Sequence, residues 1–277
     1  MHQTHEGFPS SAGSNPDAGD SGGAAPSRPL SYYEERLRAI SSGDLNFSPE
    51  DFIMTHRALE KAFIQHAGVK RASGEPFVDH SWKTLSNLWK VGIRNSDVLS
   101  AALLHDVYED SPGLRFDPQN PEGEKYIPWY KKTWEKIAEE FNPQVADLVM
   151  TMTRPVPDGS WPLNDKDADR IYADGLMRGP VGAVLIKMAD RLHNLRTLSG
   201  FDKKYGVADG ERRKRKAILG TRDTYLNIFR RDFSRPEFDD LSPRDRRAFE
   251  MARGLLYDQI VTELRKYSYF FEIPPES

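Results

Sequence analysis

Cysteine is absent from the chain of 277 residues. Disulfide bonds and thiolate chemistry are therefore excluded, and any metal ion would have to be held by histidine and carboxylate side chains. No apolar run approaches the roughly 20 residues of a membrane-spanning helix. The first residues contain neither the basic patch nor the apolar stretch of a secretory signal. We therefore expect a protein with no membrane contact and a cytoplasmic location.

Strand patterns are missing as well, because no segment alternates between apolar and polar residues over a useful length and no segment is repeated. Helix start signals recur instead: Ser or Asn precedes Pro at 48–49, 142–143 and 242–243, and we expect Ser96 to be the N-cap of another helix. Polar loops are expected over 69–80 and 111–130. The fold class is predicted to be all-α.

Composition divides the chain into three parts. Residues 1–30 are rich in Gly, Ser, Ala, Pro and Asp and are predicted to be disordered. We expect a helical domain over 31–205 and additional C-terminal helices, packed on that domain, over 206–277. The net charge of −3 argues against stable binding of nucleic acid. The basic run at 212–216 is typical of a solvated helix face, and attraction of a polyphosphate or a tRNA end is the alternative.

The segment 101–110 predicts an amphipathic helix that ends in groups able to bind a metal ion or move a proton. His105 stands four residues before Glu109, and Asp106 stands four residues before Asp110, so each pair should share a helix face. Burying an imidazole beside a carboxylate is costly unless something binds them. The alternative at this stage is a buried histidine hydrogen-bonded to a neighbouring acid.

A second segment, 181–198, predicts a strongly apolar helix with one polar stripe. Lys187, Asp190, Asn194 and Thr197 are spaced three, four and three residues apart. Such a stripe is commonly a solvated face, but the apolar surroundings of Asp190 favour the edge of a cleft.

Taken together, His80, His105, Asp106 and Asp190 supply two imidazoles and two carboxylates from separate segments. A nitrogen and oxygen set without sulfur suits Mn²⁺, Fe²⁺ or Zn²⁺, with coordination positions left for water and substrate. The arrangement resembles the HD superfamily of metal-dependent phosphohydrolases. This resemblance implies an HD-domain helical bundle with additional C-terminal helices.

Over about 52–198 the chain is similar to the hydrolase domain of the RelA/SpoT homologue family. Three motifs carry this similarity: Arg71-Ala72-Ser73-Gly74-Glu75-Pro76-Phe77 leading to His80, His105-Asp106-Val107-Tyr108-Glu109-Asp110, and Lys187-Met188-Ala189-Asp190-Arg191-Leu192-His193-Asn194-Leu195-Arg196-Thr197-Leu198. The resemblance implies removal of the 3′-pyrophosphate of the alarmones ppGpp and pppGpp, or of the adenine relative ppApp, which releases pyrophosphate and GDP or GTP. Because no strands of a synthetase domain are found, we expect a stand-alone small alarmone hydrolase. A cognate alarmone synthetase or a second copy of the chain is a conceivable partner.

The resemblance also implies a role for each matching position. One Mn²⁺ per chain, or another divalent ion, would be held by His80, His105, Asp106 and Asp190. Glu109 and Asp110 match the acidic pair that activates or orients the attacking water, and Asn194 matches a residue that contacts the substrate near the metal. Arg71 matches the arginine that packs on the guanine base, and a guanidinium plane suits that stacking. Further substrate contacts are expected from Ser73, Lys187, Arg196 and Thr197.

Three departures from the family pattern leave the choice between guanine and adenine open: Ala72 in place of a common lysine, Tyr108 in place of a small aliphatic residue, and the insertion at 111–130. Two other classes of function also stay open. One is an HD phosphohydrolase acting on another nucleotide, such as the 2′-phosphate of NADPH, and the other is a non-enzymatic alarmone sensor. The acidic pair speaks against a sensor, which needs no proton acceptor. His66 and His193 are expected to be structural histidines.

Overall fold

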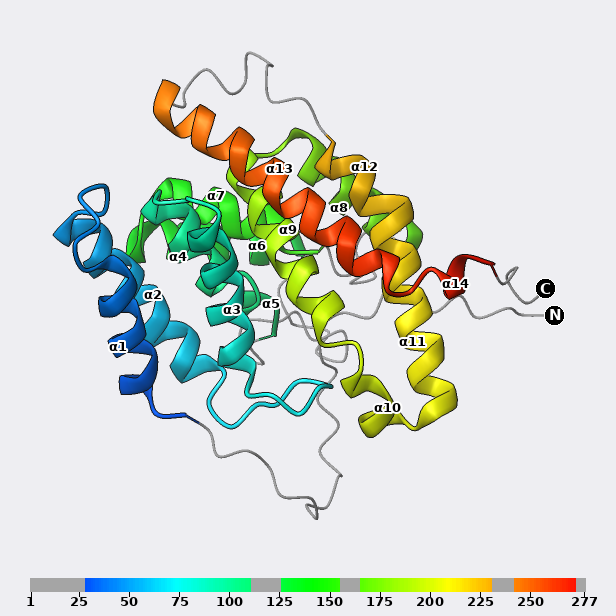
Figure 1. Cartoon of the computed structure of the whole chain (residues 1–277). Coiled ribbons are helices and arrows are strands. Elements are labelled where there is room, and N and C mark those ends of the chain that lie inside the picture. Colours follow the sequence, from blue (N-terminus) through cyan, green and yellow to red (C-terminus); the bar gives the residue numbers. More distant parts are fainter. Residues whose placement is uncertain (1–27, 111–125, 155–164, 231–241, 273–277) are drawn as a thin grey trace.

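The computed structural model describes residues 28–110, 126–154, 165–230 and 242–272, and these residues form a bundle of helices (Figure 1). Within these ranges the only β pairing is an isolated bridge between Lys70 and Pro76. The prediction of an all-α fold is confirmed. The predicted disordered tail lies almost wholly outside the described residues, as does most of the predicted loop 111–130.

Helices follow one another along the described chain in this order: α1 (Leu30–Ser41), α2 (Pro49–Gln65), α3 (Phe77–Lys90), α4 (Ser96–Leu104), α5 (Val107–Asp110), α6 (Tyr126–Glu140), α7 (Pro143–Met152), α8 (Asp165–Arg178), α9 (Val181–Arg196), α10 (Gly200–Tyr205), α11 (Val207–Gly220), the π-helical turn η1 (Thr221–Tyr225), α12 (Leu226–Phe229), α13 (Pro243–Arg265) and α14 (Tyr269–Glu272).

Helix α9 forms the centre of the bundle (Figure 1). It packs against α3, α4 and α7 and is crossed by α13, while α8 also contacts it. Nearly every side chain of α9 is buried, because apolar residues cover most of its circumference. One continuous apolar core joins α1 through α13, so the C-terminal helices share the core of the rest of the bundle. The proposed division at residue 205 stays a prediction.

Three helix starts with Ser or Asn before Pro were predicted correctly. Ser48, Asn142 and Ser242 each accept a hydrogen bond from the backbone three residues later, with proline in the first turn. Ser96 is a wrong prediction, since the N-cap of α4 is Asn95, whose side chain accepts from the backbone of Val98. Ser96 instead donates its hydroxyl to Asp51.

Two further expectations are corrected. The polar loop ends earlier than predicted, because α3 begins at Phe77 and His80 lies in its first turn. The helix predicted over 101–110 is interrupted after Leu104 and resumes as α5 at Val107. At this break the ring of His105 donates from Nδ1 to the carbonyl of Ala102 at 2.8 Å.

Two smaller differences remain. Residues 126–130 belong to α6 rather than to a loop. Helix α10 and the π-helical turn were not predicted from the sequence. None of the helices in the described ranges combines the length and apolarity that crossing a membrane requires.

Candidate metal centre

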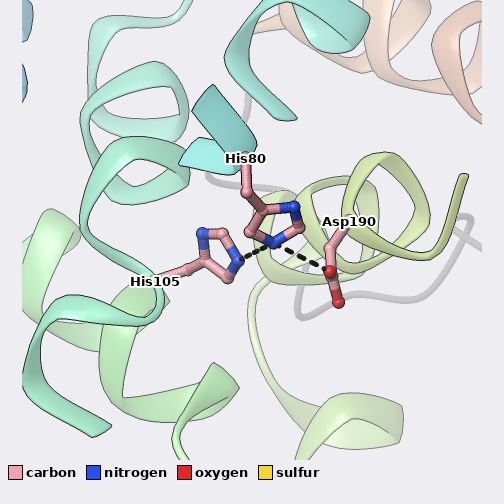
Figure 2. A group of neighbouring side chains, drawn as sticks. All are labelled: His80, His105 and Asp190. Carbon is pink, nitrogen blue, oxygen red and sulfur yellow. Dashed lines mark hydrogen bonds and ion pairs between the residues drawn. The ribbon is translucent and has the colours of Figure 1, made fainter. Parts of the chain in front are cut away.

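Four predicted ligands meet where α3, the end of α4 and α9 approach one another. His80 comes from the first turn of α3, His105 and Asp106 from the break after α4, and Asp190 from the middle of α9. Figure 2 shows the ring of His80 between His105 and Asp190. All four side chains are buried. Residues separated by more than 100 positions in the sequence therefore share one interior site.

The separations within this cluster are those of ligands to a single ion. Nε2 of His80 lies 3.1 Å from Nε2 of His105, 3.2 Å from Oδ1 of Asp190 and 3.4 Å from Oδ2 of Asp106. Nε2 of His105 lies 3.2 Å from the same Asp106 oxygen. Ligand atoms about 2.0–2.2 Å from a shared ion are themselves roughly 3–3.5 Å apart. The residues present therefore fit a divalent metal ion.

Hydrogen bonding supports this fit. Because His105 donates from Nδ1 to a carbonyl, the neutral form of its ring has a lone pair at Nε2, and this nitrogen faces Nε2 of His80. Two ring nitrogens with two buried carboxylates beside them need a proton or a cation between them. His80, His105 and Asp190 also form a group whose ligand atoms all lie within 4.8 Å of one another.

Electrostatics keeps both carboxylates ionised. Burial would raise the pKa of Asp106, but the charges and hydrogen bonds of His105 and His80 outweigh it and hold this pKa well below its usual range. Burial opposes a charged imidazole at His105, yet the neighbouring Asp106 and Asp190 raise the pKa of His105. The site therefore offers two ionised carboxylates beside two imidazoles, and these are donor groups that bind divalent cations.

Lys187 adjoins this cluster as the counter-ion of Asp190. Its Nζ lies 3.0 Å from Oδ2 of Asp190, and both groups are buried. Burial would raise the pKa of Asp190, but Lys187 first, then His80 and Arg191, hold it well below its usual range. The pKa of Lys187 is raised well above its usual value, because the charge of Asp190 outweighs burial.

Two tyrosines enclose these cations. Nζ of Lys187 lies 5.4 Å and 5.6 Å from the ring centroids of Tyr172 and Tyr225. The guanidinium of Arg191 lies 4.6 Å from the Tyr225 ring. Tyr172 of α8 and Tyr225 of the π-helical turn also line a pocket of about 210 Å³ between these elements. Residues beyond 205 therefore reach the immediate surroundings of Asp190.

Asn194 links the cluster to Arg71. It donates from Nδ2 to Oδ1 of Asp190 at 2.6 Å and accepts from Arg71 through Oδ1 at 2.5 Å. Arg71 lies on the loop before α3, with its guanidinium 5.5 Å from the ring centroid of Phe77. The loop is held against α10 at Gly200, where a Cβ would fall 2.4 Å from the Cα of Ser73.

The other predicted substrate contacts are engaged with the protein. Ser73 donates to Oε2 of Glu75 at 3.1 Å, and the hydroxyl of Thr197 bonds to the carbonyls of His193 and Asn194. Arg196 contacts Glu263 and Gln259 of α13, so it joins α13 to α9. Their roles in substrate binding stay predictions.

Glu109 and Asp110 follow the cluster on α5, within five residues of His105. Their side chains lie outside the described residues, so their catalytic role stays a prediction. Tyr108 between them and His105 is fully buried in the core, where its hydroxyl has no hydrogen-bond partner among the described residues.

Three residues of the basic run 212–216 make contacts within the protein. Lys214 is buried against Asp202 and Glu211, Arg212 pairs with Asp209 at 3.3 Å, and the guanidinium of Arg213 lies over the ring of Tyr205. These contacts favour the interpretation as a helix face over that of a nucleic-acid site.

Two features of the site escaped the sequence analysis. The first is the histidine pair: Nδ1 of His193 lies 2.7 Å from Nδ1 of His80. Burial, then the charges of His80 and Arg71, lower the pKa of His193 to about 2, so this ring stays neutral. Its position three residues after Asp190 was the available signal. The second is the tyrosine pair, for which no local pattern exists.

This fold and this cluster define a class of protein. The HD domain family matches residues 58–215, more than half of the chain. The chain belongs to the HD-domain family.

Three plant proteins are examples of the chain's relatives in sequence. The chain is 33% identical over 148 residues to the probable GTP diphosphokinase RSH2, chloroplastic, of Oryza sativa subsp. japonica, covering 50% of this chain and 18% of that protein. It is 31% identical over 170 residues to the probable GTP diphosphokinase RSH3, chloroplastic, of Arabidopsis thaliana (60% and 21%). For RSH3 of Oryza sativa subsp. japonica the identity is 29% over 218 residues (74% and 28%).

The chain therefore spans 15–28% of the length of the curated relatives it matches. The resemblance to the RelA/SpoT homologue family is confirmed by these similarities. Among solved structures, one described as "A metazoan ortholog of SpoT hydrolyzes ppGpp and plays a role in starvation responses" gives a TM-score of 0.48 at 22% identity, over 74% of this chain and 94% of that one.

Proposed function

We propose that the chain is a metal-dependent phosphohydrolase that removes the 3′-pyrophosphate of ppGpp and pppGpp or of ppApp. The observation that carries this proposal is the meeting of His80, His105, Asp106 and Asp190, with ligand atoms 3.1–3.4 Å apart. The similarity to proteins named as GTP diphosphokinases supports a guanosine nucleotide as substrate.

His80, His105, Asp106 and Asp190 would hold the ion, and we propose Mn²⁺ as its identity. A bound divalent ion would lower the pKa of the attacking water and stabilise negative charge on the phosphate oxygens. Asn194 fixes the orientation of the Asp190 carboxylate through its amide. Arg71 supplies a cation at the edge of the cluster for a nucleotide that carries several phosphates.

In the proposed reaction the water oxygen bonds to the phosphorus attached to the ribose 3′-oxygen. The bond from that phosphorus to the 3′-oxygen breaks, and the electron pair stays on the ribose oxygen. Glu109 or Asp110 accepts the proton of the water, and a proton is returned to the 3′-oxygen. The products are pyrophosphate with GDP from ppGpp, GTP from pppGpp or ADP from ppApp.

A nucleotide panel tests this function, with pyrophosphate and orthophosphate measured separately. Pyrophosphate from ppGpp or ppApp supports the proposal. Orthophosphate from NADPH supports the alternative phosphohydrolase, and binding without turnover supports a sensor. His80→Ala and Asp106→Ala should abolish both metal binding and turnover. His66→Leu is the matched control, because the His66 ring stacks on Phe77 and its Nε2 has no hydrogen-bond partner among the described residues.

The acidic pair is tested separately from the ligands. Replacing Glu109 by Gln and Asp110 by Asn preserves size and removes the proton acceptor. Turnover should fall about 10²–10⁴-fold with metal still bound. Loss of metal from this double variant would instead place the pair among the ligands.

A cytoplasmic location, a homo-oligomer and an alarmone synthetase as partner are further parts of the proposal.

A further inference from the structure

His80 uses its two ring nitrogens in opposite directions. Nε2 points into the cluster, toward His105 and Asp190 (Figure 2). Nδ1 points away from it, to Nδ1 of His193 at 2.7 Å. Both rings are almost fully buried, so water does not compete for this contact.

The proton positions follow from this geometry. A histidine that binds a metal ion through one nitrogen carries its proton on the other nitrogen. If Nε2 of His80 faces the ion, its Nδ1 must be the donor in the contact with His193. Nδ1 of His193 must then be the acceptor, and the proton of His193 lies on Nε2. That nitrogen faces Oε2 of Glu75 at 3.9 Å.

We propose that His193 is a positioning residue of the metal centre. Its Nδ1 accepts the hydrogen bond from Nδ1 of His80 and so holds His80 in the tautomer and ring orientation that present a lone pair of Nε2 to the ion. This inference rests on the metal centre proposed above and adds a residue that touches neither the ion nor the substrate.

The surroundings of His193 suit this role. It follows Asp190 by three residues on α9, so a ligand and the support of another ligand share one rigid helix. Glu75 faces the outer nitrogen of His193 and is itself oriented by the hydroxyl of Ser73 at 3.1 Å. A carboxylate, two imidazoles and the cluster therefore form a line that runs from the loop before α3 into the metal centre.

Two substitutions of nearly equal shape separate this role from simple packing. His193→Leu removes the acceptor, whereas His193→Asn can place an amide oxygen near the position of Nδ1. The dissociation constant for Mn²⁺ is measured by isothermal titration calorimetry, with melting temperatures as a check of folding. We expect His193→Leu to bind Mn²⁺ about 10–100-fold more weakly, as for other residues that orient a metal-binding histidine. His193→Asn should recover most of that loss.

His66 provides the matched control, because it is also a buried histidine near the cluster. Its ring stacks on Phe77, and its Nε2 has no hydrogen-bond partner among the described residues. His66→Leu and His66→Asn should both bind Mn²⁺ as the wild type does. Equal losses for His193→Leu and His193→Asn would show that only the shape of the ring matters and would overturn the inference.

Nitrogen chemical shifts of the Zn²⁺-loaded protein, labelled at histidine, report the proton positions directly. We expect the proton of His80 on Nδ1 and that of His193 on Nε2. A proton on Nδ1 of His193 would overturn the inference even if the variants fail to fold. If the wild type binds no divalent ion, the metal centre itself is wrong. If the wild type binds and His193→Leu binds as tightly, the metal centre stands and the role of His193 is wrong.

Discussion

Nζ of Lys187 lies 3.0 Å from Oδ2 of Asp190, while Oδ1 of the same carboxylate faces Nε2 of His80 at 3.2 Å. One oxygen of the proposed ligand is therefore neutralised by a buried lysine and the other is directed into the cluster. Without a metal ion, Lys187 is the first of the charges that stabilise ionised Asp190. With an ion bound, that task is shared.

Lys187→Met should therefore destabilise the metal-free protein more than the metal-saturated one. Removing one partner of a buried ion pair costs about 3–5 kcal/mol, and a bound Mn²⁺ supplies part of the missing positive charge. Urea unfolding with a chelator and with saturating Mn²⁺ measures both values. Lys214→Met is the control, because Lys214 pairs with Asp202 of α10 and Glu211 of its own helix, and neither acid is a proposed metal ligand. The stability lost in Lys214→Met should not depend on Mn²⁺. An equal loss for Lys187→Met in both conditions would contradict a metal ion at Asp190.

We expect Tyr225 to stabilise the fold through contacts between the face of its ring and two cations. It lies 5.6 Å from Nζ of Lys187 and 4.6 Å from the Arg191 guanidinium. A desolvated cation–aromatic contact is worth up to about 2 kcal/mol. We therefore expect Tyr225→Leu to lower the free energy of unfolding by about 2–4 kcal/mol, and Tyr225→Phe, which keeps the ring, by clearly less.

The control for this prediction is Tyr257, whose ring lies 5.6 Å from the exposed Arg230. Tyr257→Leu and Tyr257→Phe should differ from each other by under about 1 kcal/mol, as for exposed pairs. Should Tyr225→Phe be as damaging as Tyr225→Leu, the contact with the two cations is not the reason.

Local patterns were sufficient for most helices, whereas the four proposed ligands were assigned from the resemblance to the HD superfamily. Apolar spacing and capping residues depend only on neighbours in the sequence, so Ser48, Asn142 and Ser242 were predicted correctly as helix starts. The break at His105 was missed, because the apolar pattern runs through it unchanged. The structure has a hydrogen bond from the His105 ring to the carbonyl of Ala102 at this break.

Contacts between distant segments could not be predicted from spacing. Lys187 and Asn194 were correctly placed on one stripe with Asp190, yet nothing local shows that Arg71 bonds to Asn194. The approach of Tyr225 to Lys187 likewise depends on how the C-terminal elements fold back on α9. Arg196 shares the helix with Asp190 but contacts α13, because a helix turns about 100° with each residue.

The burial of His66 should make the free energy of unfolding depend on pH. Burial lowers its pKa to about 4 from a usual value of 6.5. Between these pH values the unfolded chain binds a proton that the folded protein does not. The contribution of neutral His66 to the free energy of unfolding is therefore fully present above about pH 6.5. It decreases as the pH falls toward 4. The full effect corresponds to roughly 3 kcal/mol.

His66→Leu removes the titrating group, so it should lose less stability than the wild type between pH 7 and pH 4. Urea unfolding at a series of pH values, without divalent ions, measures the difference. Titrating groups that do not interact with His66 cancel in the comparison. Parallel curves for wild type and variant would show that His66 does not carry the effect.

Arg71 is the residue on which we expect the base of the substrate to stack. One side of its guanidinium lies near Phe77, Nη2 donates to Asn194, and Nη1 has no hydrogen-bond partner among the described residues. A base would stack on the remaining face, a contact worth about 0.5–2 kcal/mol. Stacking recognises a flat ring and not a particular edge. Arg71→Ala should therefore raise KM for ppGpp and ppApp by similar factors, about 2–30-fold, with a smaller change in kcat. Arg71→Lys keeps the charge without the plane and should recover little. Steady-state kinetics on both nucleotides measures this, and a loss confined to one base would show that Arg71 recognises an edge.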